Sequence, residues 1–153
     1  SAQYLSKTAP VRPDPTPSNN YDSKVNSFLN DERWKPGIVY DDNQSPKLSP
    51  HTSSGCCAYA ADFAKYVFNK DSQSDGTKFV NPSEIRDGDI IHVTGKDHWF
   101  VVLYRNGNSL TTVEANWTDG KVFKYVGAYT VSENQLLRDG KVFRTFKAGY
   151  HFK

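Results

Sequence analysis

Residues 55–68 read Gly-Cys-Cys-Ala-Tyr-Ala-Ala-Asp-Phe-Ala-Lys-Tyr-Val-Phe, and the expected fold is built around this stretch. Its apolar residues recur with helical spacing, so we predict a helix from about Cys56 to Phe68 with one buried face. The polar residues just before it are typical of a helix N-cap. Alanines next to the buried face would let a sheet approach the helix closely. The residues of the buried face are Cys56, Ala60, Phe63 and Val67.

The two cysteines of the chain, Cys56 and Cys57, stand at the start of this helix. Adjacent cysteines do not form a disulfide framework. A thiol at a helix N-terminus lies near the positive end of the helix dipole, which favours the thiolate. Backbone N–H groups at the same place face the position where an oxyanion would form. The pattern indicates a cysteine nucleophile, and the alternative is that both thiols are small buried side chains.

Candidates for a base and an orienting group follow downstream. His98 opens a predicted strand, and Glu114 and Asn116 lie on the next one. A thiol attacks an acyl carbon as the thiolate, a neutral imidazole can take its proton, and a third polar group fixes the tautomer of the imidazole. Taken singly, His98 could be a strand-capping residue, and Glu114 and Asn116 could be polar residues on a solvated face. Together with the cysteine they suggest a catalytic group.

The turn between these two strands decides whether the candidates share a face. A two-residue turn at Asn106-Gly107 would pair residue 98 with 115 and point Glu114 away from His98. A three-residue loop would pair 98 with 116, and a five-residue loop would pair 98 with 114. The catalytic interpretation therefore requires an odd loop or a bulge, and a three-residue loop suits Asn106-Gly107-Asn108.

Other residues offer alternatives. Cys57 would replace Cys56 as nucleophile if the helix began one residue later. His92, in mid-strand, is a second candidate base, His51 could line the cleft, and His151 is expected in solvent. Cysteine, histidine and glutamate also bind zinc, but adjacent cysteines with a distant histidine lack the usual Cys-x2-4-Cys spacing. We therefore expect neither a metal nor another cofactor.

The length of 153 residues suits one domain. Residues 1–20 are rich in proline, serine and asparagine and predict an extended linker or arm. The domain is expected over 21–153, with a first helix within 21–34, a turn-rich loop over 38–50, and strands from Phe79 onward. A short helix is predicted over 132–137. Helices followed by a run of antiparallel strands predict an α+β fold.

Composition limits the possible partners. The net charge is +2 with 24% charged residues and no basic run, which gives no reason to expect a nucleic-acid partner. No apolar run approaches the roughly 20 residues that a membrane-spanning helix needs, so we expect no membrane insertion. Hydrophobic residues make up 37% of the chain and aromatic residues 14%, which is enough to build a core.

Four short motifs, in this order and spacing, resemble those of the CHAP and NlpC/P60 group of papain-like cysteine amidases and peptidases. The resemblance covers roughly residues 21–130. It implies a papain-like α+β fold with N-terminal helices packed on an antiparallel sheet. The motifs are Gly55-Cys56-Cys57-Ala58-Tyr59-Ala60, Asp87-Gly88-Asp89-Ile90-Ile91, His98-Trp99-Phe100-Val101-Val102 and Val113-Glu114-Ala115-Asn116-Trp117.

The resemblance implies that Cys56 is the nucleophile, that His98 is the general base, and that Glu114 orients His98 with help from Asn116. It also implies hydrolysis of amide bonds in peptidoglycan through a thioester, in a bacterial protein that is secreted or at the cell surface. The substrate would be a peptide or peptidoglycan, and the chain would be a monomer or one module of a larger secreted protein. The alternatives are a secreted cysteine protease that acts on proteins, or a catalytically silent module of the same fold that binds a peptide or glycan.

The chain departs from the family at the residue before the nucleophile. CHAP domains usually have glutamine there, and NlpC/P60 enzymes usually have aspartate there with a helper tyrosine upstream. This chain has Gly55. Ser53, Ser54 or backbone N–H groups alone would then have to supply the oxyanion hole.

Overall fold

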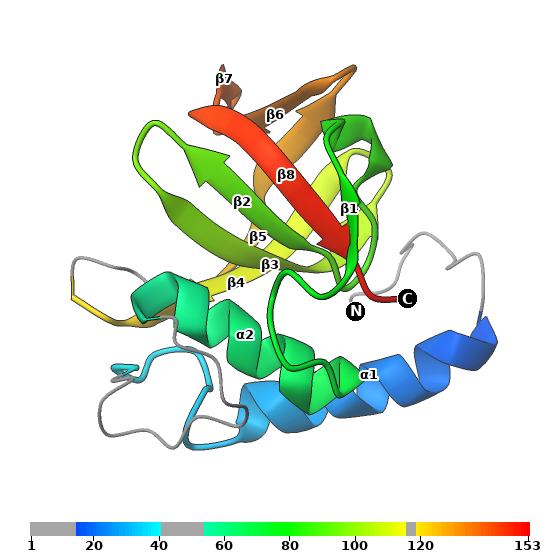
Figure 1. Ribbon diagram of the computed structural model, residues 1–153, viewed down its shortest axis with the longest axis vertical. Helices are drawn as coiled ribbons and strands as arrows, with labels where there is room; N and C mark the ends of the chain where they lie inside the picture. The colour runs from blue at the N-terminus through cyan, green and yellow to red at the C-terminus, as the bar shows by residue number, and fades with distance from the viewer. Residues whose placement is uncertain (1–14, 41–53, 116–118) are drawn as a thin grey trace.

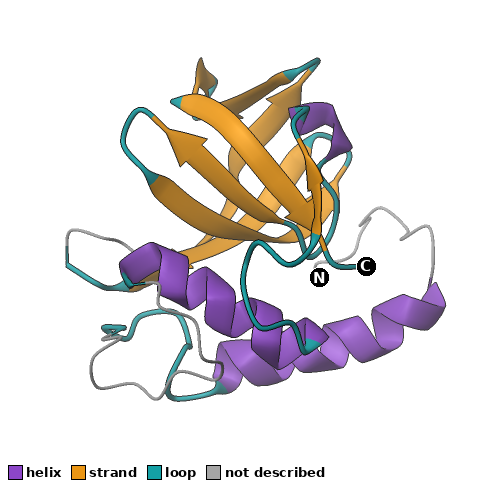
Figure 2. Cartoon of the chain, in the orientation of Figure 1, coloured by secondary structure: helices purple, strands orange, loops and turns teal. Residues whose placement is uncertain are grey.

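The structure, a computed structural model, describes residues 15–40, 54–115 and 119–153, with side chains from Asn20 onward. The described residues form two α-helices and one sheet of eight strands, with a single 3-10 turn, η1 (Pro82–Glu84) (Figure 2). The predicted α+β class is therefore confirmed. The helices are α1 (Pro15–Asn30) and α2 (Gly55–Phe68). The strands are β1 (Thr77–Phe79), β2 (Ile90–Thr94), β3 (His98–Asn106), β4 (Ser109–Ala115), β5 (Val122–Ser132), β6 (Gln135–Arg138), β7 (Lys141–Val142) and β8 (Thr145–His151).

The sheet is antiparallel throughout and has the strand order β1-β8-β2-β3-β4-β5-β6-β7. It curls into a half-barrel, and both helices lie on its outer side (Figure 1). Helix α2 packs against β3 and β4, and α1 packs against α2. The N-terminus of α2 is thereby held next to the end of the sheet where β3 begins.

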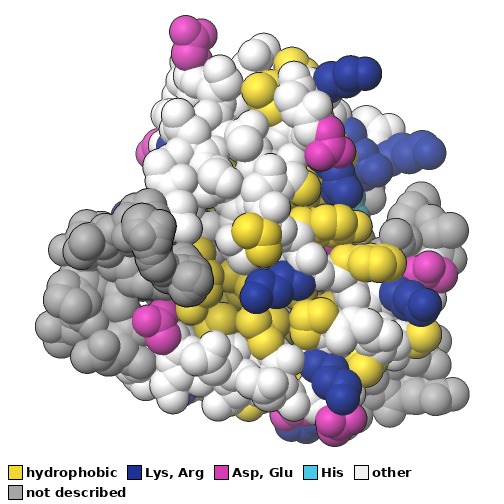
Figure 3. Space-filling view, turned by 180° about the vertical axis from the view of Figure 1, so that it is seen from behind, with side chains coloured by type: hydrophobic (Ala, Val, Ile, Leu, Met, Phe, Trp, Pro, Cys, Tyr) yellow, Lys and Arg dark blue, Asp and Glu magenta, His cyan; other side chains and the backbone are white. Residues whose placement is uncertain are grey.

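Two hydrophobic clusters fill the two sides of the sheet. The outer cluster joins both helices to alternate residues of β3, which are Trp99, Val101 and Leu103. The inner cluster joins residues from strands as far apart as β1 and β6, and from β3 it includes Phe100 and Val102. Seen from behind, hydrophobic side chains also reach the surface, with side chains of both charge signs around them (Figure 3).

The β3–β4 hairpin contains a bulge that sets the side on which its residues lie. Asn106 pairs with Ser109, so the loop has two residues, and the predicted three-residue loop is wrong. Tyr104 then pairs with Thr111, but Val102 pairs with Thr112, which leaves Leu103 as an extra residue. This insertion shifts the register by one residue. Between the bulge and the start of β3, even-numbered residues of the two strands therefore face the same side, which places His98 and Glu114 together as the catalytic interpretation requires.

Helix α1 begins earlier than expected. The predicted arm covered residues 1–20, but the chain is helical from Pro15 to Asn30. Proline is tolerated in the first turn of a helix because the N–H groups there have no intrahelical acceptor. The proline-rich composition therefore did not exclude a helix start at Pro15. Residues 1–14 of the predicted arm lie outside the described residues.

The C-terminal half also differs from the prediction. The short helix expected over 132–137 is absent, because β5 and β6 pair directly as a hairpin from Ser132 with Gln135 onward. Glu133 in its turn has a left-handed backbone, with φ of 53°. Strand β8 pairs with β1 on one side and with β2 on the other. Of the loop predicted over 38–50, residues 41–50 lie outside the described part of the chain.

Neither described helix has the length and apolar character needed to cross a membrane.

Candidate active site

Cys56 is the second residue of α2, where the sequence pattern predicted the helix to begin. Ser54 occupies the N-cap position with extended backbone, and Gly55 follows with φ of 59°. The first backbone hydrogen bond of the helix runs from the N–H of Ala58 to the carbonyl of Ser54 at 3.3 Å. The backbone N–H of Cys56 therefore lies before the first donor of the intrahelical hydrogen bonds, as the first N–H groups of a helix do. The side chain of Cys56 is buried at the edge of the outer cluster.

His98 joins Cys56 to Glu114. Its Nε2 lies 2.8 Å from Oε1 of Glu114, and Cys56 lies close enough to the imidazole to raise its pKa. Because Nε2 is engaged with the carboxylate, Nδ1 is the ring nitrogen left for the thiol. His98 and Glu114 are each 6% exposed. The structure thus brings together three of the four residues predicted for the site.

The environment of His98 favours its protonated form. Burial lowers its pKa, but the hydrogen bonds with Cys56 and Glu114 and the charges of both raise it more, so the pKa is about 9. A protonated imidazole next to a sulfur stabilises the thiolate. The arrangement therefore favours an imidazolium at position 98 at neutral pH, with the carboxylate of Glu114 on one side of the ring and the sulfur of Cys56 near the other.

The hydrogen bonds continue beyond Glu114 to two residues that the sequence did not indicate. The hydroxyl of Tyr129, on β5, lies 3.0 Å from Oε2 of Glu114. Nη1 of Arg138, on β6, donates to that hydroxyl at 2.7 Å. Burial is the main cause that raises the pKa of Tyr129, and the neighbouring charge of Glu114 adds to it. Tyr129 therefore stays a neutral phenol. A prediction that β5 and β6 pair with Tyr129 opposite Arg138 would have indicated this contact.

The second cysteine has a different partner. Sγ of Cys57 accepts a hydrogen bond of 2.7 Å from Nε2 of Gln73, a buried residue in the loop after α2. Of the two thiols, Cys56 is the one that acts on the pKa of His98. This arrangement favours Cys56 over Cys57 as the nucleophile.

The alternative base His92 is engaged elsewhere. Its Nε2 lies 2.6 Å from Oδ1 of Asp97, and its ring stacks on Trp99 with centroids 4.0 Å apart. Trp99 belongs to the outer cluster, whereas the ring of His98 lies near Phe100 of the inner cluster. His92 and His98 therefore occupy opposite sides of the sheet.

His151 was expected in solvent, and that expectation is wrong. Its Nδ1 lies 2.8 Å from Oδ1 of the fully buried Asp89, and its ring stacks on Phe79. Burial raises the pKa of Asp89 to about 8, and burial followed by the charge of Arg86 lowers the pKa of His151. Both pKa shifts favour the neutral forms of Asp89 and His151 at neutral pH. The pair joins the turn before β2 to the end of β8.

Three residues considered from the sequence, His51, Ser53 and Asn116, lie outside the described residues. Ser54 is exposed, and its side chain makes no cap hydrogen bond. Within the ranges that the structure describes, no three His, Cys, Asp or Glu side chains are grouped so as to hold a metal ion.

The described residues provide a thiol, an imidazole with a raised pKa, a buried carboxylate behind it, and a backbone N–H at a helix start. These are the groups that nucleophilic acyl transfer requires. Comparison with models of known protein families, with curated proteins and with solved structures found no match.

Proposed function

We propose that this protein is a papain-like cysteine hydrolase that cleaves amide bonds, with Cys56 as nucleophile, His98 as general acid and base, and Glu114 as the group that orients His98. The observation that carries the proposal is the hydrogen bond between His98 and Glu114, with the thiol of Cys56 near enough to raise the pKa of the same imidazole. The order of the four sequence motifs supports the papain-like assignment of the fold.

In this mechanism the Cys56 thiolate attacks the carbonyl carbon of the amide and the carbonyl oxygen becomes an oxyanion. The backbone N–H of Cys56 is the hydrogen-bond donor that would stabilise this negative charge. Nδ1 of protonated His98 then gives its proton to the leaving nitrogen, so the C–N bond breaks and a thioester remains. His98, now neutral, takes a proton from water as the water attacks the thioester. The carboxylic acid leaves and the thiolate returns.

For the substrate class we propose peptide or amide bonds of peptidoglycan, and for the location a secreted or cell-surface position in a bacterium. Both come from the resemblance of the motifs to CHAP and NlpC/P60 enzymes. The chemistry of Cys56, His98 and Glu114 would serve a protein substrate equally well, so the experiment includes one.

The test is digestion of purified peptidoglycan, and separately of a denatured protein, followed by mass spectrometry of the products. The wild-type protein is compared with Cys56→Ala and with Cys57→Ala as the matched control. New termini in the peptidoglycan digest with wild type and Cys57→Ala, and none with Cys56→Ala, are expected. New termini only in the protein digest would replace the cell-wall substrate by a protein substrate.

Thiol reactivity separates an enzyme from a silent binding module. We expect iodoacetamide to label Cys56 much faster than a free peptide thiol at pH 6–7, because a protonated imidazole and a helix N-terminus beside a sulfur favour the thiolate. Labelling at the rate of a free peptide thiol, together with no cleavage of either substrate, would refute the hydrolase proposal.

A further inference from the structure

Both oxygens of the Glu114 carboxylate have a hydrogen-bond partner, one toward His98 and one on the other side. Oε1 faces Nε2 of His98 at 2.8 Å, and Oε2 faces the hydroxyl of Tyr129 at 3.0 Å. A buried carboxylate that is hydrogen-bonded at only one oxygen is free to turn about its last bond and is poorly stabilised as an anion. The second hydrogen bond opposes both effects.

The hydroxyl of Tyr129 has one proton, and its surroundings direct that proton. Nη1 of Arg138 donates to the hydroxyl oxygen at 2.7 Å, and an arginine side chain can only donate. The single proton of Tyr129 is therefore available for Glu114. Tyr129 is fully buried, and its ring stacks on Phe100 with centroids 4.6 Å apart, so the hydroxyl has little freedom to point elsewhere.

Arg138 is fixed by aromatic rings rather than by an acidic partner at close range. Its guanidinium carbon lies 4.6 Å from the ring centroid of Tyr125, 4.9 Å from that of Tyr129 and 5.9 Å from that of Phe143. The distance to the carboxylate of the neighbouring Asp139 is 3.9 Å, and that carboxylate is 78% exposed. The positive charge of Arg138 is thus directed at the Tyr129–Glu114 pair on the inner side of the sheet.

We infer that Tyr129 and Arg138 are positioning residues for the reaction, which hold the carboxylate of Glu114 aimed at Nε2 of His98. The inference extends the proposed function, because it assigns two further residues to the same site. Neither residue touches the thiol, and both act through Glu114.

The test uses Tyr129→Phe, which removes the hydroxyl and keeps the ring that packs on Phe100. Without the hydroxyl the carboxylate of Glu114 loses the partner of its Oε2 and can turn away from Nε2, which weakens its interaction with the imidazole. We expect NMR titration of the His98 imidazole to show its pKa lower by about 1 than in the wild type. The rate of iodoacetamide labelling of Cys56 at pH 7 is expected to fall by about threefold to tenfold.

Two comparisons separate positioning from general loss of stability. Tyr59→Phe is the matched control, because its buried hydroxyl donates a 2.7 Å hydrogen bond to the carbonyl of Trp34 on the helix side. It should lower stability without changing the titration of His98. In a Glu114→Gln background, Tyr129→Phe should have no further effect on that titration, because the group through which it acts is gone.

Arg138 is tested by Arg138→Met and Arg138→Lys. Loss of the charge in Arg138→Met should lower the pKa of His98, and Arg138→Lys, which keeps the charge, should retain most of the wild-type value. An unchanged or higher pKa of His98 in Tyr129→Phe, or equal effects of that substitution with and without Glu114, would overturn the inference. The titration does not depend on cleavage of any substrate, so a protein without hydrolase activity would still give a decisive result here.

Discussion

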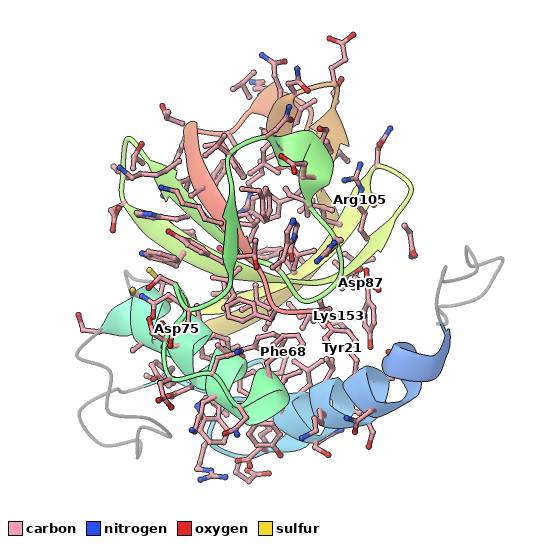
Figure 4. All side chains as sticks on the ribbon, turned by 45° about the vertical axis from the view of Figure 1, so that its right-hand side comes forward. Tyr21, Phe68, Asp75, Asp87, Arg105 and Lys153 are labelled. Atoms are coloured by element: carbon pink, nitrogen blue, oxygen red, sulfur yellow. The ribbon has the colours of Figure 1, made fainter. Side chains whose placement is uncertain are left out.

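The hydroxyl of Tyr21, on α1, donates a 2.6 Å hydrogen bond to the carbonyl of Leu103, the extra residue of the β3 bulge. Tyr21 also stacks on Phe68 of α2 and has Nζ of Lys153 4.3 Å from its ring centroid (Figure 4). A bulged residue does not take part in the regular ladder, so its carbonyl needs another donor. The first helix provides that donor across the outer side of the sheet.

Tyr21→Phe is therefore expected to lower the free energy of unfolding by about 1–3 kcal/mol, because the buried carbonyl of Leu103 loses its partner. Urea denaturation of the variant and the wild type measures the difference. Tyr104→Phe removes a hydroxyl from a half-buried residue that bonds to Asp22, and it should cost less. Equal stability of Tyr21→Phe and wild type would show that the carbonyl finds another donor.

The protonation of His98 predicts a pH dependence of stability. Its pKa of about 9 in the folded state exceeds the ordinary value of 6.5, so the folded state holds the proton more tightly. The resulting stabilisation is fully present below pH 6.5 and is lost as the pH rises through 9. We expect a loss on the order of 3 kcal/mol over this interval.

Unfolding in urea at several pH values from 6 to 9.5, for wild type and His98→Gln, measures this effect. Asp89 and His151 titrate in both proteins, so the difference between the two curves isolates His98. Parallel curves for the two proteins would contradict the prediction.

Gly55 has the left-handed φ of 59° immediately before the nucleophile. Among the described residues, an added Cβ would meet no atom within 4 Å, so the cost expected from them is one of backbone conformation. We expect Gly55→Ala to lower stability by about 1–2 kcal/mol, and Gly55→Asn to cost less because asparagine tolerates this conformation. Thermal unfolding measures this loss of stability. Equal losses in the two variants would argue against a conformational cost at position 55.

The same pair of variants tests the placement of the thiol. Relief of the strain by a change of φ would move Cys56 relative to His98, so iodoacetamide labelling should slow more in Gly55→Ala than in Gly55→Asn. If both variants label at the wild-type rate, the backbone at position 55 does not control the thiol.

Thr112 is fully buried on β4, and its hydroxyl has no hydrogen-bond partner among the described residues. A buried hydroxyl without a partner costs free energy. Thr112→Val keeps the shape and removes this cost, so we expect the free energy of unfolding to rise by about 1–2 kcal/mol. Thr111→Val, at the half-buried neighbour, is the control and should change it by less. A clear loss of stability in Thr112→Val would mean that the hydroxyl has a partner in solution.

Sequence reasoning succeeded where the determinants are local. The helix from Gly55 to Phe68 follows from the spacing of its apolar residues, and the helix start places Cys56 as predicted. It was harder to predict that His98 and Glu114 lie on the same side of the sheet, because Asn106-Gly107-Asn108 is compatible with several loop lengths. The bulge at Leu103 decides the outcome, and its carbonyl is bonded by Tyr21, far away in the sequence.

The positioning residues were missed for a related reason. Residues 132–137 contain good helix formers after a serine, which locally favours a helix. Pairing with β5 overrides this preference and makes a hairpin, and only that hairpin puts Arg138 opposite Tyr129. Strand pairing depends on the whole sheet, so a local pattern does not reveal it.

The position of β8 between β1 and β2 has a consequence for how the chain folds. Until residues 145–151 pair with their neighbours, β1 and the edge of β2 that faces β8 have unpaired backbone groups, which are open to association with other chains. A chain cut before Thr145 would keep both of these edges open, so we expect it to aggregate where the full chain does not.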